Sequence, residues 1–375
     1  MLKTEYLPGF VFILFLAAMS IMYVLLPKQE YSPLEKRYLS GFPEFSFESL
    51  LEGEYTQGIE DFLADNTPLR AGFVGINSYY NLAIGNNGAN GVYLGKNGML
   101  IEKPADENNN LERNIGRIKE FAENESIPVN MFVVPSKGFI YHDNLPLNSL
   151  KYKDKEYFEY IENNLGDNVN FINIIDKFDL QAKKEKMFYN TDHHWTSAGA
   201  YFGYENICEA MGLKAKEKTD FNIESYTDFY GTSYSTSAYY LTPRESIEVW
   251  RDKNTGGDAA VEIIEGSKSD KYDNLFFDEN LNTDDKYTVY LDGNHSMVKI
   301  HNSDASSNKK LLLIKDSFAH CLAPFLSYNY SDIVMIDLRY YKLSVKDLIK
   351  EENCDDILFV YGIDNICTST DIILN

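Results

Sequence analysis

At positions 190–196 the chain reads Asn190-Thr191-Asp192-His193-His194-Trp195-Thr196, which gathers an acid, two imidazoles and an indole in one short stretch. The preceding run 171–175 is apolar and β-branched, a pattern that predicts a buried strand. Behind the stretch, Thr196 can cap a helix over residues 197–211, and Gly212 can end that helix. We therefore expect residues 190–196 to form a loop between a strand and the N-terminus of a helix.

Within this loop, Asp192 and His194 stand two positions apart. That spacing lets the carboxylate accept the Nδ1 proton of the imidazole and leaves Nε2 available as a base. The pair therefore predicts two members of a serine-type catalytic triad.

A candidate nucleophile follows the apolar run 311–314, where Lys315-Asp316-Ser317 ends a predicted buried strand and a short helix over 318–326 begins. A serine at a strand-to-helix turn holds its hydroxyl at the carboxyl edge of the sheet, where open α/β sheets bind ligands. The adjacent helix N-terminus would stabilise an oxyanion. Alternatively, Ser317 only caps the helix, as serine often does. The presence of Asp192 and His194 favours the nucleophile.

These two motifs resemble the signatures of the DHHW family, bacterial proteins related to the SGNH-hydrolase-like domains of alginate O-acetyltransferases. The resemblance implies that Asp192 and His194 supply acid and base and that Ser317 is a downstream nucleophile, an order permuted relative to ordinary SGNH esterases. It extends from residue 31 to the C-terminus, and it departs from the alginate enzymes in the basic Lys315 beside Asp316. Weaker matches lie at residues 65–70, 91–98, 293–295 and 337–341.

Strand-like and helix-like segments alternate over residues 111–375, which predicts an α/β domain with a mostly parallel sheet and helices on both faces. By resemblance, this is the three-layer SGNH-hydrolase-like (flavodoxin-like) architecture. Residues 215–304 interrupt the alternation and are expected to form a β-rich insertion beside the site. Further strands are predicted at 129–134, 333–336 and 357–361, and helices at 111–124 and 154–165.

Residues 28–110 are expected to form a connecting segment and a small N-terminal subdomain. Its pattern predicts helices over 47–64 and 69–82 and a hairpin over 91–100 with Lys96-Asn97-Gly98 at the turn. Asp65 and Arg70 lie at the break between the helices. We expect them to form an ion pair that fixes this region.

Residues 1–27 are expected to form a cytoplasmic tip and a transmembrane signal anchor. Residues 7–26 are apolar and uncharged, a run long enough to cross a bilayer core of ~30 Å. The segment Ala17-Ala18-Met19 lacks an Ala-x-Ala cleavage pattern, so a retained anchor is favoured over a cleaved signal peptide. The N-terminal position and the family resemblance predict a single-pass protein of the cell membrane whose catalytic domain is extracytoplasmic.

The composition is acidic: 35 Lys and Arg stand against 57 Asp and Glu, which gives a net charge of −22. This balance argues against nucleic-acid partners and suits a domain that meets neutral sugars, although a solvated acidic surface gives the same balance. The four cysteines show no Cys-x-x-Cys spacing, so neither zinc nor a redox motif is indicated. A disulfide between Cys354 and Cys367 remains open for an exported chain.

Other residues are candidates for binding an oxyanion or the substrate. Asn294 and Arg339 are candidate donors beside the Ser317 N–H, although Gly293-Asn294 can equally form a tight turn. His193 is expected to contact substrate or a nearby backbone group, and Trp195 either stacks on a sugar or packs beneath the loop. Adjacent histidines point in different directions and lack metal-ligand spacing, so no metal or other cofactor is expected.

Together these features predict a membrane-anchored O-acetyltransferase that modifies hydroxyls of an exported or cell-wall polysaccharide through an acetyl-serine intermediate. A cell-envelope acetylesterase would use the same residues with water as acceptor, and a non-catalytic polysaccharide-binding or assembly protein would keep only the fold. A distance of about 3.2 Å or less between Ser317 Oγ and His194 Nε2 would favour an enzyme. The resemblance also implies a membrane-bound O-acyltransferase as the acetyl supplier.

Overall fold

The computed structural model describes residues 6–105 and 109–374. The chain forms two compact units, the first comprising residues 1–90 and 235–240 and the second residues 91–234 and 241–375. Residues 1–5 of the predicted anchor region and 106–108 of the predicted subdomain lie outside the described residues.

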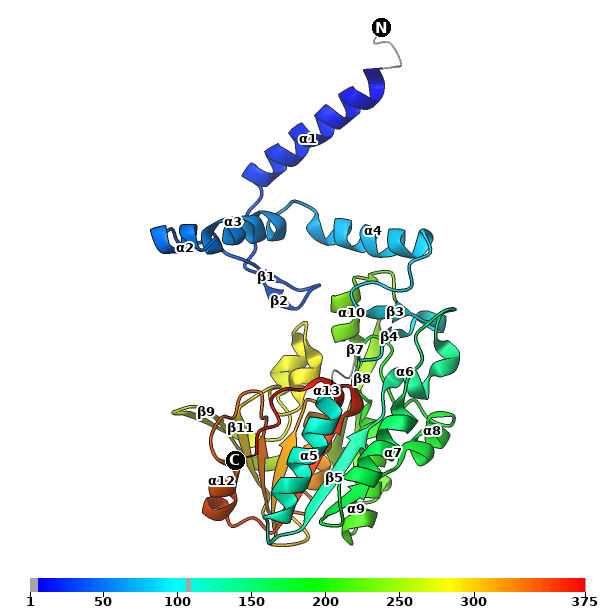
Figure 1. The fold of residues 1–375 in the computed structure, drawn as a ribbon, viewed down its shortest axis with the longest axis vertical. Helices are drawn as coiled ribbons and strands as arrows, with labels where there is room; N and C mark the ends of the chain where they lie inside the picture. Colours follow the sequence, from blue (N-terminus) through cyan, green and yellow to red (C-terminus); the bar gives the residue numbers. More distant parts are fainter. Residues whose placement is uncertain (1–5, 106–108, 375) are drawn as a thin grey trace. The chain divides into compact units, whose positions relative to one another are not determined.

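The first unit is mainly helical (Figure 1). Its helix α1 (Leu7–Leu25) leaves every side chain exposed or half-exposed, and it is long and apolar enough to be a membrane anchor or a signal sequence. A capping box in which Ser46 and Ser49 exchange hydrogen bonds begins α2 (Phe47–Leu51). The remaining elements are β1 (Tyr31–Ser32), β2 (Arg37–Tyr38), α3 (Glu54–Asp65) and α4 (Arg70–Ala83).

Asp65 ties these elements together. Its carboxylate accepts hydrogen bonds from Arg37 at 2.6 and 2.9 Å and from the Ser40 N–H at 2.9 Å. The Arg37 guanidinium lowers the pKa of Asp65 to about 2. Arg70 Nε lies 3.6 Å from the same carboxylate, so the predicted Asp65–Arg70 ion pair is confirmed. Arg37 lies closer to the Asp65 carboxylate than Arg70 does.

The second unit is built on an eight-stranded sheet in the order β10-β9-β11-β13-β12-β14-β5-β6. The five neighbouring strands β13, β12, β14, β5 and β6 are parallel to one another. Beyond β13, the strands β11, β9 and β10 follow, and each is antiparallel to its neighbours. The sheet is therefore mostly parallel, as predicted. Its strands are β5 (Val129–Val134), β6 (Val169–Ile172), β9 (Asp258–Glu265), β10 (Lys268–Asn274), β11 (Met297–His301), β12 (Lys310–Lys315), β13 (Asp332–Ile336) and β14 (Asp356–Gly362).

Side chains on the two faces of this sheet enter separate apolar clusters, because successive strand residues point in opposite directions. Along β5, Met131 and Val133 belong to one cluster, and Phe132 and Val134 belong to the other. Helices contribute apolar residues to both clusters. The first contains residues of α5 (Asn110–Glu123), α7 (Asp154–Asn164), α12 (Val345–Glu352) and α13 (Ile363–Thr368), and the second contains residues of α8 (Ile175–Ala182), α9 (Ser197–Met211) and α11 (Ala319–Leu326).

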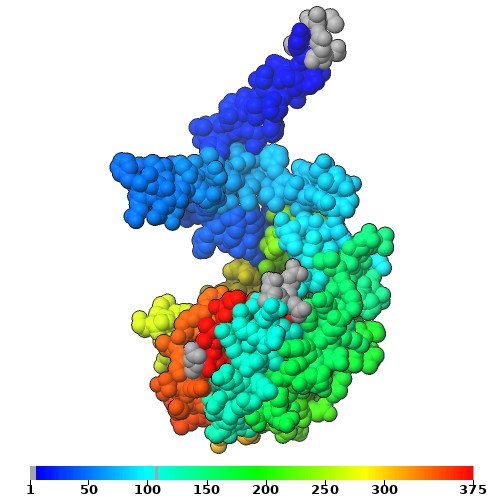
Figure 2. Space-filling view, in the orientation of Figure 1, coloured from blue at the N-terminus to red at the C-terminus, as the bar shows by residue number. Residues whose placement is uncertain are grey.

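The C-terminal segment is held against α5. Asn114 Nδ2 donates to the Ile366 and Ser369 carbonyls at 2.9 Å, and Arg117 donates to the Ile372 carbonyl at 2.8 Å. In the space-filling view, the cyan residues of α5 lie beside red C-terminal residues (Figure 2). These bonds fix α13, which follows the end of β14.

The strand predicted at 171–175 is wrong at its C-terminal end. The strand β6 stops at Ile172, and α8 begins at Ile175. Asn173 explains the change, because its side-chain oxygen accepts a hydrogen bond from the Ile175 N–H at 3.3 Å and turns the chain out of the sheet.

Residues 215–304 contain two kinds of β structure. The strands β7 (Phe221–Phe229) and β8 (Glu245–Asp252) pair as an antiparallel ribbon, with α10 (Thr232–Ser237) between them in the sequence. By contrast, β9, β10 and β11 extend the central sheet, since Val298 and Ile300 of β11 pair with the apolar strand β13. This part of the segment is therefore continuous with the main sheet.

The predicted hairpin is formed by β3 (Val92–Leu94) and β4 (Leu100–Glu102), which pair antiparallel around η2 (Lys96–Gly98). Asn97 and Gly98 have φ of 58° and 73° there, which suits Asn and Gly best. The remaining short helices are α6 (Lys137–Ile140), η3 (His142–Asn144), η4 (Lys218–Asp220), η5 (Asp278–Asn282) and η6 (Lys286–Val289).

The four cysteines are buried thiols, including Cys354 and Cys367, for which the sequence left a disulfide open. Burial raises the pKa of Cys208 and Cys321 to about 12 and that of Cys354 to about 11. Such thiols stay protonated and serve as small packing residues.

Candidate active site

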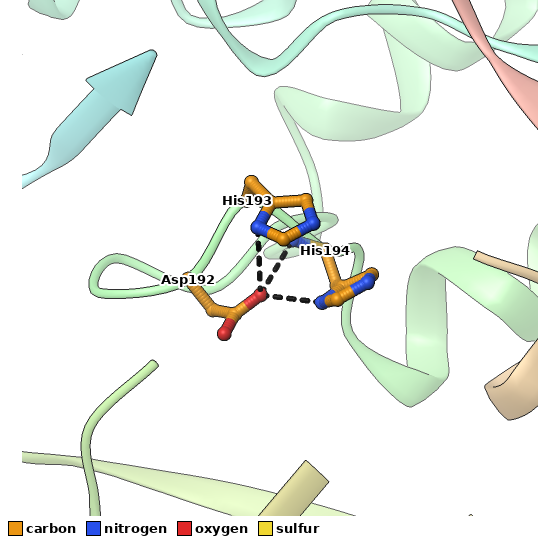
Figure 3. A group of neighbouring side chains, drawn as sticks. All are labelled: Asp192, His193 and His194. Carbon is orange, nitrogen blue, oxygen red and sulfur yellow. Dashed lines mark hydrogen bonds and ion pairs between the residues drawn. The ribbon is translucent and has the colours of Figure 1, made fainter. Parts of the chain in front are cut away.

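The loop that leads into α9 meets the turn between β12 and α11. His194 in the loop places Nε2 at 2.8 Å from Ser317 Oγ in the turn. Its Nδ1 lies 2.6 Å from Asp192 Oδ1, and its backbone N–H donates to the same oxygen at 2.8 Å. Figure 3 shows the Asp192 carboxylate turned toward the neighbouring imidazoles. The structure thus joins the three residues selected from the sequence in one hydrogen-bonded chain, at distances suited to proton transfer.

Residues 190–196, which we call the acid–base loop, are held in place by a buried lysine, Lys137. Lys137, 3% exposed at the start of α6, donates to the carbonyl oxygens of Asp192 at 2.9 Å, of Asn190 at 3.1 Å and of Leu100. Burial lowers the pKa of Lys137, and the nearby carboxylate of Glu102 opposes that shift. The sequence analysis missed this residue. Its position directly after the strand 129–134, at the sheet edge that also carries Ser317, was the available signal.

Glu245 at the start of β8 fixes the same loop from another side. Its carboxylate accepts hydrogen bonds from the Asn190 N–H at 2.8 Å, the Thr191 N–H at 2.6 Å and the Thr191 hydroxyl at 2.5 Å. The Lys186 ammonium group also donates to the Glu245 carboxylate, at 2.7 Å. This carboxylate satisfies loop N–H groups that no helix or strand would bond, and nothing in its sequence surroundings identified it.

Residues from the segment 215–304 enclose Asp192 and His194. The Thr232 N–H donates to Asp192 Oδ2 at 2.7 Å, so both carboxylate oxygens have partners. Gly231 packs so closely on Asp192 that a Cβ at this position would overlap its side chain. The Tyr287 ring stacks on the imidazole of His194 with centroids 4.0 Å apart and planes inclined by 8°. The imidazole is therefore fixed in orientation as well as in position.

The Ser317 turn is braced by its neighbour Asp316. This buried carboxylate accepts hydrogen bonds from the Phe318 N–H at 2.9 Å, the Gly362 N–H at 2.7 Å and Asn365 Nδ2 at 2.6 Å. Burial raises the pKa of Asp316, and these three donors oppose the shift. Within the described ranges 6–105 and 109–374, no protein group accepts a hydrogen bond from the Ser317 N–H. That N–H can therefore donate to an oxyanion that forms at Ser317.

Trp195 packs beneath the loop and is fully buried, so the prediction that it binds substrate is wrong. A sugar cannot reach a ring that has no exposed surface. The indole Nε1–H donates to the Phe318 carbonyl at 3.0 Å. The residue thus links the loop of His194 to the turn of Ser317, and the packing alternative is the correct one.

Comparison with known sequences assigns the chain to a family. The sequence profile of the family described as DHHW protein matches residues 35–99 and 122–336, well over half of the chain. The chain belongs to the DHHW family. No curated protein matches the sequence significantly.

Two solved structures named first below share the fold of this DHHW protein, with TM-scores above 0.5. A DHHW family protein from Eubacterium siraeum is 22% identical with a TM-score of 0.66, over 76% of this chain and 97% of that chain. Bacillus cereus PatB1, solved with a sulfonyl adduct, is 20% identical with a TM-score of 0.63, over 74% and 96%. The O-acetyltransferase domain of Pseudomonas putida AlgJ is 14% identical with a TM-score of 0.47, over 75% and 94%.

In this DHHW protein, the predicted donors Asn294 and Arg339 contact each other, because Arg339 Nη2 donates to Asn294 Oδ1 at 3.1 Å. Arg339 donates to both carboxylate oxygens of Asp337 at 2.9 and 2.6 Å. Asp337 also accepts from the buried Lys315 at 3.1 Å, and Lys315 Nζ lies 2.7 Å from His320 Nε2. Among the described residues, none of these bonds reaches Ser317. The basic residue beside the serine motif is therefore paired within a network of its own.

His193 is half-exposed beside Asp192 and His194. Its ring centroid lies 3.9 Å from that of His194, and its Nδ1 is 3.7 Å from Asp192 Oδ1. Asp192, His193 and His194 place possible metal-ligand atoms within 4.8 Å of one another. The hydrogen bonds of His194 to Asp192 and Ser317 occupy both ring nitrogens, however. A metal ligated by His194 would have to replace one of them, so metal binding and the triad compete for the same atoms.

Proposed function

We propose that this DHHW protein is a serine-dependent O-acetyltransferase that modifies hydroxyls of an exported or cell-wall polysaccharide. The observation that carries the proposal is the chain Ser317–His194–Asp192, with heavy-atom distances of 2.8 and 2.6 Å. A polysaccharide-binding protein without catalysis would not need a base in contact with a serine hydroxyl at a strand-to-helix turn.

The reaction proceeds in two transfers. His194 Nε2 takes the Ser317 proton as Oγ attacks the carbonyl carbon of an acetyl donor, and the protonated imidazole passes that proton to the leaving group. Asp192 stabilises the imidazolium, and the Ser317 N–H stabilises the oxyanion. A sugar hydroxyl then attacks the acetyl-serine. A new sugar O–C bond forms, the bond from the acetyl carbon to Oγ breaks, and the sugar proton returns through His194 to Ser317.

An acetylesterase would use the same groups with water in place of the sugar. The structure of PatB1 with a sulfonyl adduct supports a reactive site on this fold, and we expect Ser317 to accept such a group here. The acceptor then distinguishes the two functions. A transferase makes acetylated oligosaccharide faster than free acetate, whereas an esterase releases only acetate when an acceptor is present.

We further propose that α1 is a retained anchor and that the second unit lies outside the cytoplasmic membrane. Acetyl groups made in the cytoplasm must then cross the bilayer, so we expect a multi-spanning membrane-bound O-acyltransferase to supply them. Protease added to intact cells should digest the chain from residue 28 onward and leave the segment 7–26 in the membrane. A soluble mature form that begins near Ser20 would show cleavage instead.

Substitution of each triad member tests the proposed chemistry. We expect Ser317→Ala, His194→Ala and Asp192→Ala in the full-length protein to reduce acetyl transfer from 4-nitrophenyl acetate by about 10⁴-fold, since loss of one member disables the unit. His193→Ala is the matched control, because it removes the adjacent imidazole and should retain far more activity. An inactive His193→Ala with an active His194→Ala would overturn the assignment of the base.

A further inference from the structure

The helix α4 of the first unit exposes a face that carries no charge. Phe73 is 41% exposed, Ile76 68% and Tyr80 59%, and Ile84 at the end of the helix is 56% exposed. These positions are three or four residues apart, so they form one stripe along the helix, which we call the apolar stripe. Arg70 is the only charged residue of α4. A helix face exposed to water usually carries charged side chains, so this face indicates contact with an apolar medium.

The opposite face of α4 is packed within the first unit. The Ser78 hydroxyl donates to the Ser237 carbonyl at 2.8 Å. The ring of Tyr79 meets that of Tyr239 with centroids 5.4 Å apart. Rotating the helix to bury the apolar stripe would break both contacts, so the packing determines which face is exposed.

The N-terminal part of α4 lies against α1. The rings of Phe73 and Phe15 meet edge to face, with centroids 6.5 Å apart and planes inclined by 89°. Residues 69–72 also line a common cavity with Met22 and Leu26 at the end of α1. Phe15 stands near the middle of α1, about 15 Å from its C-terminal end at 1.5 Å per residue. The apolar stripe is therefore continuous, at Phe73, with the exposed surface of α1.

Charge does not select what covers the apolar stripe. The guanidinium of Arg70 pairs with Glu35 and lies 3.6 Å from Asp65, so the one charge of α4 is neutralised within the first unit. The net charge of −22 also disfavours attraction to an anionic surface. Apolar contact is therefore the interaction that this face offers.

We propose that α4 lies in the extracytoplasmic surface layer of the bilayer that α1 crosses, with the apolar stripe among the acyl chains. The inference rests on the anchor proposed above and assigns a second membrane contact to this protein. If α1 spans the ~30 Å hydrocarbon core, Phe15 lies inside that core, and the Phe73 ring that contacts it lies there too. Tyr80 suits the boundary of this layer, because its ring is apolar and its hydroxyl is polar.

Quenching of tryptophan fluorescence tests the proposal in the full-length protein. Both native tryptophans are buried in the second unit and give a constant background. In vesicles of brominated phosphatidylcholine, the indole added by Ile76→Trp should lose about half or more of its emission, because an interfacial helix buries its apolar face ~5–10 Å deep. Leu180→Trp is the control, since Leu180 is 59% exposed on α8 of the second unit. Iodide in the water, and not brominated lipid, should quench it.

An added indole at Ile76→Trp that keeps its emission in brominated lipid, or that is quenched no more than Leu180→Trp, would overturn the proposal. A second copy that covers the apolar stripe would shield Ile76→Trp from both quenchers and would give disulfide-linked dimers of Ile76→Cys after oxidation. That result would also overturn the proposal.

The variant Phe12→Trp separates this inference from the anchor itself, because Phe12 is 60% exposed on α1. Brominated lipid that quenches Phe12→Trp and Ile76→Trp alike supports both proposals. Quenching of Phe12→Trp alone would overturn the contact of α4 and leave the anchor in place. Without quenching of Phe12→Trp, α1 would not lie in the bilayer, and the anchor would be refuted together with this inference.

Discussion

Replacing Trp195 with phenylalanine tests whether the buried indole aligns the acid–base loop with the nucleophile. The Trp195 Nε1–H donates to the Phe318 carbonyl at 3.0 Å, and the side chain lies fully buried in an apolar cluster beneath the sheet edge. Phenylalanine keeps a ring at this position but has no donor. The variant therefore removes the link to the Ser317 turn and retains most of the packing.

The magnitude follows from two contributions. Loss of the hydrogen bond costs about 1 kcal/mol, because Phe318 is the N-cap of α11 and an N-cap carbonyl still accepts the first hydrogen bond within the helix. Removal of roughly 40 Å³ of side chain adds about 1 kcal/mol at ~24 cal/mol per Å³ of cavity. We expect the free energy of unfolding to fall by about 2 kcal/mol. A nucleophile misplaced by ~1 Å loses about 100-fold in rate, so kcat/KM should fall by about 10- to 100-fold.

The matched control is Trp250→Phe, because the chain has only these two tryptophans. Trp250 is 3% exposed in the same cluster and donates to Glu248 at 3.2 Å, and its ring packs on Tyr201 and Phe325. Urea unfolding should show a similar loss of stability. Hydrolysis of 4-nitrophenyl acetate by Trp250→Phe should stay within about twofold of the wild type. Wild-type kcat/KM in Trp195→Phe, or equal losses in both variants, would refute the alignment role.

Three further perturbations have defined outcomes. Gly231→Ala should reduce acetyl transfer by about 100-fold with little change in circular dichroism, because its Cβ would displace the Asp192 side chain; wild-type activity would contradict the packing. Lys137→Met should lower the free energy of unfolding in urea by about 2–4 kcal/mol, since two loop carbonyls and the Leu100 carbonyl of β4 lose their donor, and an unchanged midpoint would contradict this. Burial raises the pKa of Asp154 from 3.8 to about 6, so between these pH values the folded state binds a proton that the unfolded state has lost. The stability that this proton contributes is therefore lost as the pH rises from about 4 to above 6. Asp154→Asn should remove up to about 3 kcal/mol of that pH dependence. A variant whose stability changes with pH between 4 and 7 as the wild type does would exclude the effect.

The sequence determined the features that depend on local pattern. Apolar runs identified the strands around β5, β12 and β14, and the uncharged run at the N-terminus identified α1. Two short motifs also supplied the members of the proposed triad. The Ser317 motif lies between β12 and α11, as predicted, whereas the loop of Asp192 and His194 lies between the helices α8 and α9 and not directly after a strand. The complementary chemistry of a serine, a histidine and an aspartate allowed residues 123 positions apart to be paired before any coordinates were considered.

Only the tertiary structure decided which other side chains support these three. Lys137 and Glu245 hold the acid–base loop, and Tyr287 stacks on the imidazole, yet each comes from a different connection of the chain. Their roles depend on the order of strands in the sheet and on the path of residues 215–304. Spacing along the chain carries no information about such contacts, because the partners are chosen by packing across the sheet edge.

The same distinction applies to residues whose contacts could not be predicted from the sequence. Trp195 could have been a sugar platform or a packing residue on its sequence alone, because only neighbours distant in sequence determine whether an indole is exposed. Arg339 bonds Asp337 and Asn294, which their sequence positions did not indicate, and the role of Asn294 and Arg339 as oxyanion donors stays a prediction. Local chemistry selected the groups that we propose to react, and long-range packing decided which side chains surround them.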